Sequence, residues 1–154
     1  MAGRKSSPGI DYYYEAADIV VSDSIKLLLL KHGADGFWAY KCLLYRVCVD
    51  KGYYFDMNEA EYFELFCFDT IKLTAEKVMS IIESCIKYKL FDGTLFNQYK
   101  ILTSKDIQEN YAKATKDRRR HGTQVNMYQE FLLIDLPVED GIIKMNIIQR
   151  FTDT

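Results

Sequence analysis

Residues 90–120 constrain the fold more than any other part of the chain. Leu90-Phe91 and Ile101-Leu102-Thr103 predict two short strands, and Asp92-Gly93 between them predicts a turn or the start of a short helical turn near residues 95–99. Ser104 then predicts the cap of a last helix that becomes basic toward Arg118-Arg119-Arg120. The apolar positions of that helix, which we expect to face inward, are Ile107, Tyr111 and Ala114. This plan is typical of a small nucleic-acid-associated module and not of a catalytic cleft.

Four helices are predicted before this segment. The first follows the Ser22-Asp23 cap and runs to about His32, where Gly33 stops it. The second spans residues 35–50 and is apolar around most of its circumference, which indicates a central helix. A third spans about residues 58–68, after a short aromatic strand at Tyr53-Tyr54-Phe55. The fourth is capped by Thr74, and its apolar positions follow the helical period closely: Ala75, Val78, Ile81, Ile82, Cys85 and Ile86.

The order helix, strand, helix, helix, strand, strand, helix predicts a mostly α (α+β) fold. We expect a winged-helix-like arrangement, with helices around a small antiparallel sheet and residues 74–88 in the position of a recognition helix. The winged-helix-like domain covers residues 10–121, and residues 1–9 form a flexible N-terminal arm. Residues 122–154 form a C-terminal tail, in which 131–136 and 142–148 could pair as a β-hairpin. Such a hairpin would pack on the domain or on a second copy.

Length and charge limit the possible partners. At 154 residues the chain fits one domain, and Lys+Arg 20 against Asp+Glu 22 leaves no overall basic field, so any contact with nucleic acid has to be local. The four cysteines lack metal-ligand spacing and lie among apolar residues, which favours a reducing cytoplasm. No segment has the length of a signal sequence or a membrane span.

Several motifs match a known family. They include Asp11-Tyr12-Tyr13, the run from Ser22 to Leu28, and the run from Lys31 to Tyr40. Further matches are Asp50-Lys51-Gly52-Tyr53-Tyr54, Leu90-Phe91-Asp92, and Ile101-Leu102-Thr103-Ser104 with Ile107-Gln108 and Tyr111. Over roughly residues 10–120 the chain resembles the N-terminal winged-helix domains of unknown function in phage and mobile-element replication proteins, which are similar to the N-terminal domain of the primosomal protein DnaD.

The resemblance implies architecture more strongly than biochemistry, because the matching residues are mainly glycines at helix ends and core aromatics. Together with the basic run and the lack of a catalytic motif, it leads us to expect a non-enzymatic, DNA-associated protein of phage or mobile-element type. We expect it to act in replication initiation or primosome assembly in the cytoplasm of a bacterial or phage-infected cell. Replication proteins or a second copy of the chain are the implied protein partners. The alternative is a protein–protein interaction or oligomerisation domain that does not bind DNA directly.

The candidate nucleic-acid-binding residues are Lys113, Lys116, Arg118, Arg119 and Arg120, with His121 beside them. Cations at this end of a helix could neutralise phosphates and release counterions, or could simply offset the negative pole of the helix dipole. The expected recognition helix carries both acidic and basic side chains, so we do not expect it to recognise specific bases. Its polar side chains are Glu76, Lys77, Ser80, Glu83, Ser84, Lys87 and Lys89.

The remaining groups of histidines, tyrosines and carboxylates are better explained by ordinary structural roles. His32 and His121 lack neighbours at zinc-ligand spacing, so no metal or cofactor is expected. Tyr12-Tyr13-Tyr14 could stack on bases, although core packing is the commoner use. The carboxylates Asp56, Glu59, Glu61 and Glu64 fit a solvated helix face. No nucleophile–base pair or phosphate loop is present, so we expect neither an enzyme nor a small-molecule substrate.

Overall fold

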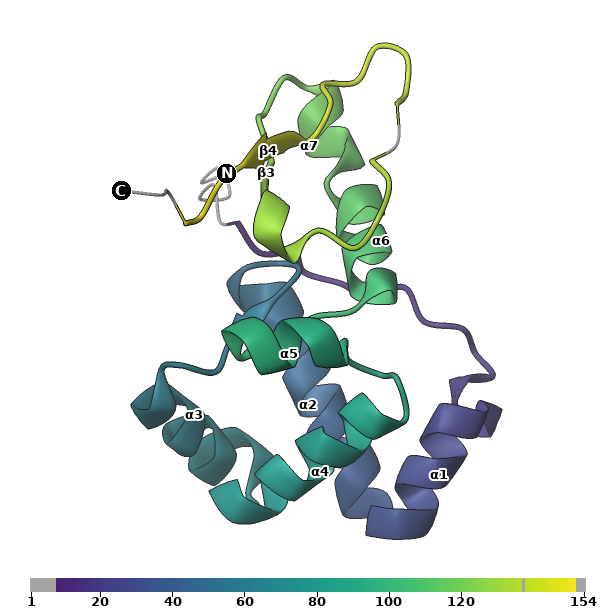
Figure 1. The fold of residues 1–154 in the computed structure, drawn as a ribbon. Helices are drawn as coiled ribbons and strands as arrows, with labels where there is room; N and C mark the ends of the chain where they lie inside the picture. Colours follow the sequence, from purple (N-terminus) through teal and green to yellow (C-terminus); the bar gives the residue numbers. More distant parts are fainter. Residues whose placement is uncertain (1–7, 137, 152–154) are drawn as a thin grey trace, which may run out of the picture.

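The protein is mostly helical. The computed structural model describes residues 8–136 and 138–151, and within them it contains seven α-helices and two small two-stranded sheets (Figure 1). The helices are α1 (Asp23–His32), α2 (Ala34–Asp50), α3 (Ala60–Phe66), α4 (Ala75–Lys87), α5 (Gly93–Tyr99), α6 (Lys105–Ala114) and α7 (Lys116–Arg120). The strands are β1 (Phe55–Asp56), β2 (Ile101–Leu102), β3 (Asn126–Tyr128) and β4 (Asn146–Ile148). Shorter turns are η1 (Ile19–Val21), the π-helical η2 (Cys67–Ile71) and η3 (Gln129–Phe131).

Local capping explains where several helices begin. Thr74, Asp92 and Ser104 each accept a hydrogen bond from a backbone N–H three residues on, and so cap α4, α5 and α6. Gly33 separates α1 from α2 with a positive φ of 67°. Ser22 precedes α1 as expected, but its side chain makes no capping bond.

Helix α2 lies at the centre of the group of helices formed by α1–α5. This agrees with the prediction made from the apolar residues around most of its circumference. Helix α2 packs against α1, α4, η2 and β1, and α1 and α3 lie on opposite sides of it (Figure 1). Leu43, Leu44 and Val47 of α2 are fully buried, and they meet Val78, Ile81 and Ile82 of α4 in one continuous core. One side of α2 stays accessible, since Trp38, Tyr45 and Val49 are about half exposed, and the rest of the helix is enclosed by its neighbours.

The prediction of a strand at Leu90-Phe91 is wrong. After α4 the chain turns through Lys89, whose φ is 64°, and the N–H of Leu90 donates to the carbonyl of Cys85. These residues therefore close the end of α4 instead of pairing as a strand. Only β1 and β2 pair here, antiparallel, so the small sheet has two strands and not three. The mostly helical class is confirmed, whereas the winged-helix assignment stays a prediction.

The hairpin expected from residues 131–136 and 142–148 is also wrong. The pairing segments are β3 and β4, and they run parallel. The reason is Gln108, a fully buried side chain on α6 that donates to the carbonyl of Phe131 and accepts from the N–H of Leu133. Since this amide satisfies the backbone on both sides of Leu132, the segment is held against α6 and does not need a strand partner.

The tail is attached to the domain by an arginine near its end. The guanidinium of Arg150 lies 5.2–5.8 Å from the ring centres of Tyr54, Tyr128, Phe131 and Phe151. It also forms an ion pair with Asp56 at 3.0 Å, so Asp56 has a partner and is not part of a solvated carboxylate face. Charge and aromatic stacking together hold residues 126–151 on the β1 side of the molecule.

The expected N-terminal arm of residues 1–9 lies outside the described residues, except for Pro8 and Gly9. Gly9 accepts a hydrogen bond from Arg118, and the N–H of Ile10 donates to the carbonyl of Cys48 near the end of α2. Gly9 and Ile10 are therefore packed on the domain.

Candidate functional site

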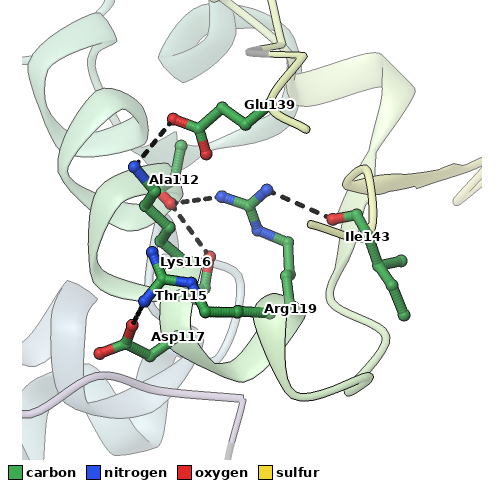
Figure 2. Close-up of polar contacts among 8 residues, drawn as sticks. Ala112, Thr115, Lys116, Asp117, Arg119, Glu139 and Ile143 are labelled. Carbon is green, nitrogen blue, oxygen red and sulfur yellow. Dashed lines mark hydrogen bonds and ion pairs between the residues drawn. The ribbon is translucent and has the colours of Figure 1, made fainter. Parts of the chain in front are cut away.

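The central arginine of the basic run lies inside the protein. Arg119 is 1% exposed, and its guanidinium donates to the carbonyl of Ala112 at 2.7 Å and to that of Ile143 at 3.3 Å (Figure 2). One carbonyl belongs to α6 and the other to the C-terminal tail. Arg119 thus ties the tail to the helix, and we leave it out of any surface that could meet phosphate.

The neighbouring cations are largely engaged with their own chain. Lys116 forms an ion pair with Glu139 of the tail at 3.1 Å, which Figure 2 also shows. Arg120 pairs with Asp117 at 2.8 Å, and Arg118 donates to the carbonyl of Gly9. Lys113 is exposed. The predicted residues therefore lie near one another on α6 and α7, but most of their charge is directed into contacts that hold the fold together.

The outer side of α4 is partly covered as well. Ser84 is buried and not exposed as predicted, because α1 packs on it and His32 Nε2 lies 2.8 Å from its hydroxyl. Burial, followed by the nearby charges of Lys31 and Lys77, holds the pKa of His32 below its ordinary value. Lys77 pairs with Asp35 of α2 at 2.6 Å. The side of α4 that a recognition helix would offer is thus partly used for packing and pairing within the domain.

A different surface stands out on α3 and η2. Tyr62, Leu65 and Phe68 are 64%, 60% and 80% exposed, and their three-residue spacing brings them to one outward side of the helix. The inner side carries Phe63 and Cys67, which are buried in the core. We call the three exposed side chains the α3 face. Sequence reasoning missed it, although a seven-residue helix with apolar residues on all sides was the available signal.

Carboxylates surround the α3 face. Glu59, Glu61, Glu64 and Asp69 are all exposed, and none of them forms an ion pair with the residues that the structure describes. No Lys, Arg or His occurs between residues 52 and 71. A depression of about 520 Å³ opens beside Phe68, between η2 and the start of α4, and Cys67, Leu73 and Ala75 are among the residues that line it.

The tyrosines near the N-terminus divide between two environments. Tyr12 and Tyr14 are exposed, with ring centres 5.3 Å apart. Tyr13 is partly buried against the core, and burial raises its pKa to about 12. The N–H of Tyr14 donates to Asn110 of α6, which holds this segment in place.

Two further properties concern the described residues as a whole. None of their helices has the length and apolar character needed to cross a membrane. No three of their His, Cys, Asp or Glu side chains come together in a group that could hold a metal ion.

Residues 12–107 match a family model whose description is Lin1244/Lin1753-like, N-terminal. The chain is also 29% identical over 134 residues to the "Uncharacterized phage-related protein Lin1244/Lin1753" of Listeria innocua. That alignment covers 87% of this chain and 42% of the Listeria protein, so the chain spans less than half of its relative's length. No solved structure matches the chain.

Proposed function

Because the chain belongs to the Lin1244/Lin1753-like N-terminal family, we propose that it is a non-enzymatic protein-interaction module of a phage-related protein. The observation that carries this proposal is the α3 face, where three large apolar side chains point into solvent from one side of a short helix. Single exposed apolar residues are ordinary on protein surfaces, whereas a contiguous group surrounded by polar residues marks a binding surface.

The energetics of the α3 face support the same function. Burying a side chain of this size against a partner contributes roughly 1.5–3 kcal/mol, so three of them could supply the centre of a specific interface. The π-helical turn η2 places Phe68 at the rim of the depression, and such turns occur often at functional sites. The core below is already complete without these side chains.

Site-specific photo-crosslinking tests this function. We would place a photoreactive amino acid at position 62, in the α3 face, and in a second protein at position 113, on α6. A module that binds protein gives one discrete protein adduct from position 62 in host cells and none from position 113. The adduct should disappear when Leu65 and Phe68 are both changed to glutamine. Its absence from position 62, or an unchanged yield in the double variant, would contradict the proposal.

Direct DNA contact is the second candidate function, and replication initiation or primosome assembly is the setting that the family resemblance suggests. The observation in its favour is that Lys113 is exposed and that Lys116 and Arg120 follow it at three- and four-residue spacing. The two partners of these cations, Glu139 and Asp117, would compete with phosphate. We therefore expect weak binding that depends strongly on salt.

An anisotropy titration of labelled duplex DNA against salt tests the DNA contact. If Lys113 and Arg120 each meet a phosphate, changing both to glutamine lowers the slope of log affinity against log salt by about 2. The matched control changes Lys26 and Lys31 of α1, which removes the same charge elsewhere and should leave the slope less affected. The same salt slope for the parent protein, the Lys113 and Arg120 variant and the Lys26 and Lys31 variant would contradict this DNA contact.

A further inference from the structure

We infer that the α3 face binds a cationic amphipathic helix that belongs to another protein. This inference rests on the proposed function and adds the chemistry of the partner. It follows from three features of the described residues: the spacing of the apolar side chains, the sign of the charges around them and the depression at one end.

The spacing fits a helix as the occupant. Phe68 lies six positions after Tyr62, which corresponds to about 9 Å along a helix axis. A partner helix with apolar residues at positions i, i+3 or i+4, and i+7 presents its anchors over about 10 Å. The depression beside Phe68, at about 520 Å³, has room for a large apolar side chain at one end of such a row.

The charge around the face selects a cationic partner. Glu59, Glu61, Glu64 and Asp69 place four negative charges within eleven residues, and none is neutralised by an ion pair among the described residues. Two cations lie nearby: Lys72 lines the depression beside Phe68, and Arg46 of α2 stacks on Phe66, so the four carboxylates still outnumber them. Lysine or arginine residues that flank the apolar row of a partner would meet these carboxylates, which speeds association and fixes orientation.

The same charges disfavour a symmetric dimer through this face. An isologous contact would bring four carboxylates from each copy into one interface, and like charges placed opposite one another suppress association. Another exposed apolar patch has the opposite sign: Leu27 and Leu30 on α1 lie beside Lys26 and Lys31. That patch is the natural control, because Leu30 is 84% exposed but would repel a cationic helix.

Peptide binding provides the test. The probe is a fluorescein-labelled peptide of about 18 residues, made of leucine and lysine in amphipathic helical order, and its counterpart carries glutamate in place of lysine. We expect the leucine–lysine peptide to bind the whole chain and the leucine–glutamate peptide to bind at least tenfold more weakly. Leu65→Gln with Phe68→Gln should weaken binding of the lysine peptide about tenfold or more. Leu27→Gln with Leu30→Gln should leave it unchanged.

A charge variant separates electrostatics from apolar contact. Glu61→Gln with Glu64→Gln should reduce affinity about three- to tenfold at low salt and should flatten the dependence on salt. All substituted side chains are exposed, so circular dichroism and thermal unfolding should match the parent protein and confirm that the variants are folded.

The outcomes distinguish this inference from the proposed function. Equal binding of the lysine and glutamate peptides, or unchanged binding in the Leu65 and Phe68 double variant, overturns the cationic-helix assignment. If position 62 still crosslinks to a protein in cells, the interaction function stands while its partner chemistry fails. If the crosslinked species is a second copy of this chain, the inference of a separate partner is overturned.

Discussion

Gly52 is a residue at which one added methyl group meets two separate obstacles. Its φ is 93°, a region that other residues rarely adopt, and a Cβ there would lie 2.4 Å from Cε2 of Tyr111. We expect Gly52→Ala to lower the free energy of unfolding by about 2–4 kcal/mol, measured by urea denaturation. Gly122→Ala is the matched control, because its φ is 90° and no atom lies within 4 Å of the added Cβ. A loss as large in Gly122→Ala would show that the tyrosine contact contributes nothing.

Arg119 is buried, although it belongs to a run of charged residues that we expected at the surface. Arg119→Gln removes two charge-assisted hydrogen bonds, to the carbonyls of Ala112 and Ile143, and a hydrogen bond to a charged group contributes about 1.5–3 kcal/mol. We expect that loss of stability in urea denaturation, with little change in DNA affinity when native protein is titrated. Arg120→Gln breaks an exposed pair and should cost less than about 1 kcal/mol. A stable Arg119→Gln protein with weaker DNA binding would reverse our assignment.

At the scale of elements, the contact between α1 and α4 makes stability depend on pH. The pKa of His32 lies below its ordinary value of 6.5 in the folded chain, so the unfolded chain takes up a proton first as the pH falls. The contribution of His32 is therefore complete above about pH 6.5 and is lost as the pH drops through the folded pKa. We expect the loss of stability between pH 7.5 and pH 5.5, followed by urea unfolding, to be smaller in His32→Gln than in the parent. An identical loss of stability in His32→Gln and in the parent protein would contradict this account.

The elements also show how far local patterns determine this fold. Thr74 and Ser104 act within three residues, and the starts of the helices that they cap were predicted correctly, whereas the helix after Ser104 ends at Ala114 and α7 follows separately. The segment after Phe131 was not, because its conformation depends on Gln108, which lies 23 residues earlier in the chain. Leu90-Phe91 has strand-like composition, but the preceding helix determines its geometry through the carbonyl of Cys85. Local signals thus predicted caps, whereas contacts between distant residues determined the pairing of strands.

At the scale of the whole molecule, the same limit applies to the candidate site. Arg118, Arg119 and Arg120 are equivalent in sequence, and the one that turns inward is identified by its contacts with the carbonyls of Ala112 and Ile143. In α3, the apolar residues Tyr62, Phe63, Leu65 and Phe66 leave the inner side undetermined until α2 and the core are in place. The charge run could be found from the sequence, but the burial of Arg119 and the choice of which apolar residues of α3 face outward could not.

The four thiols should report unfolding of the whole molecule. Cys42, Cys48, Cys67 and Cys85 are buried, and burial raises each pKa, to about 11 for Cys48 and Cys67 and to about 12 for Cys85. Since the thiolate is the reactive form, a disulfide reagent at pH 8 should modify the native protein slowly and all four thiols rapidly in urea. We expect the modification rate to follow the unfolding transition measured by circular dichroism. Rapid modification of one thiol in native protein would reveal local opening around it.

The packing of the tail on the domain has a consequence for circular permutation of the chain. Pro8 and Ile148 line the same hollow of about 230 Å³ beside Tyr53 and Tyr111, so two segments far apart in the sequence lie close together there. Two such segments can be joined by a short linker and the chain reopened in an exposed loop, and the packing between the elements is then kept. New ends placed near Gly141, where the tail turns at the surface, would then leave α3 and its outward side chains in their present surroundings.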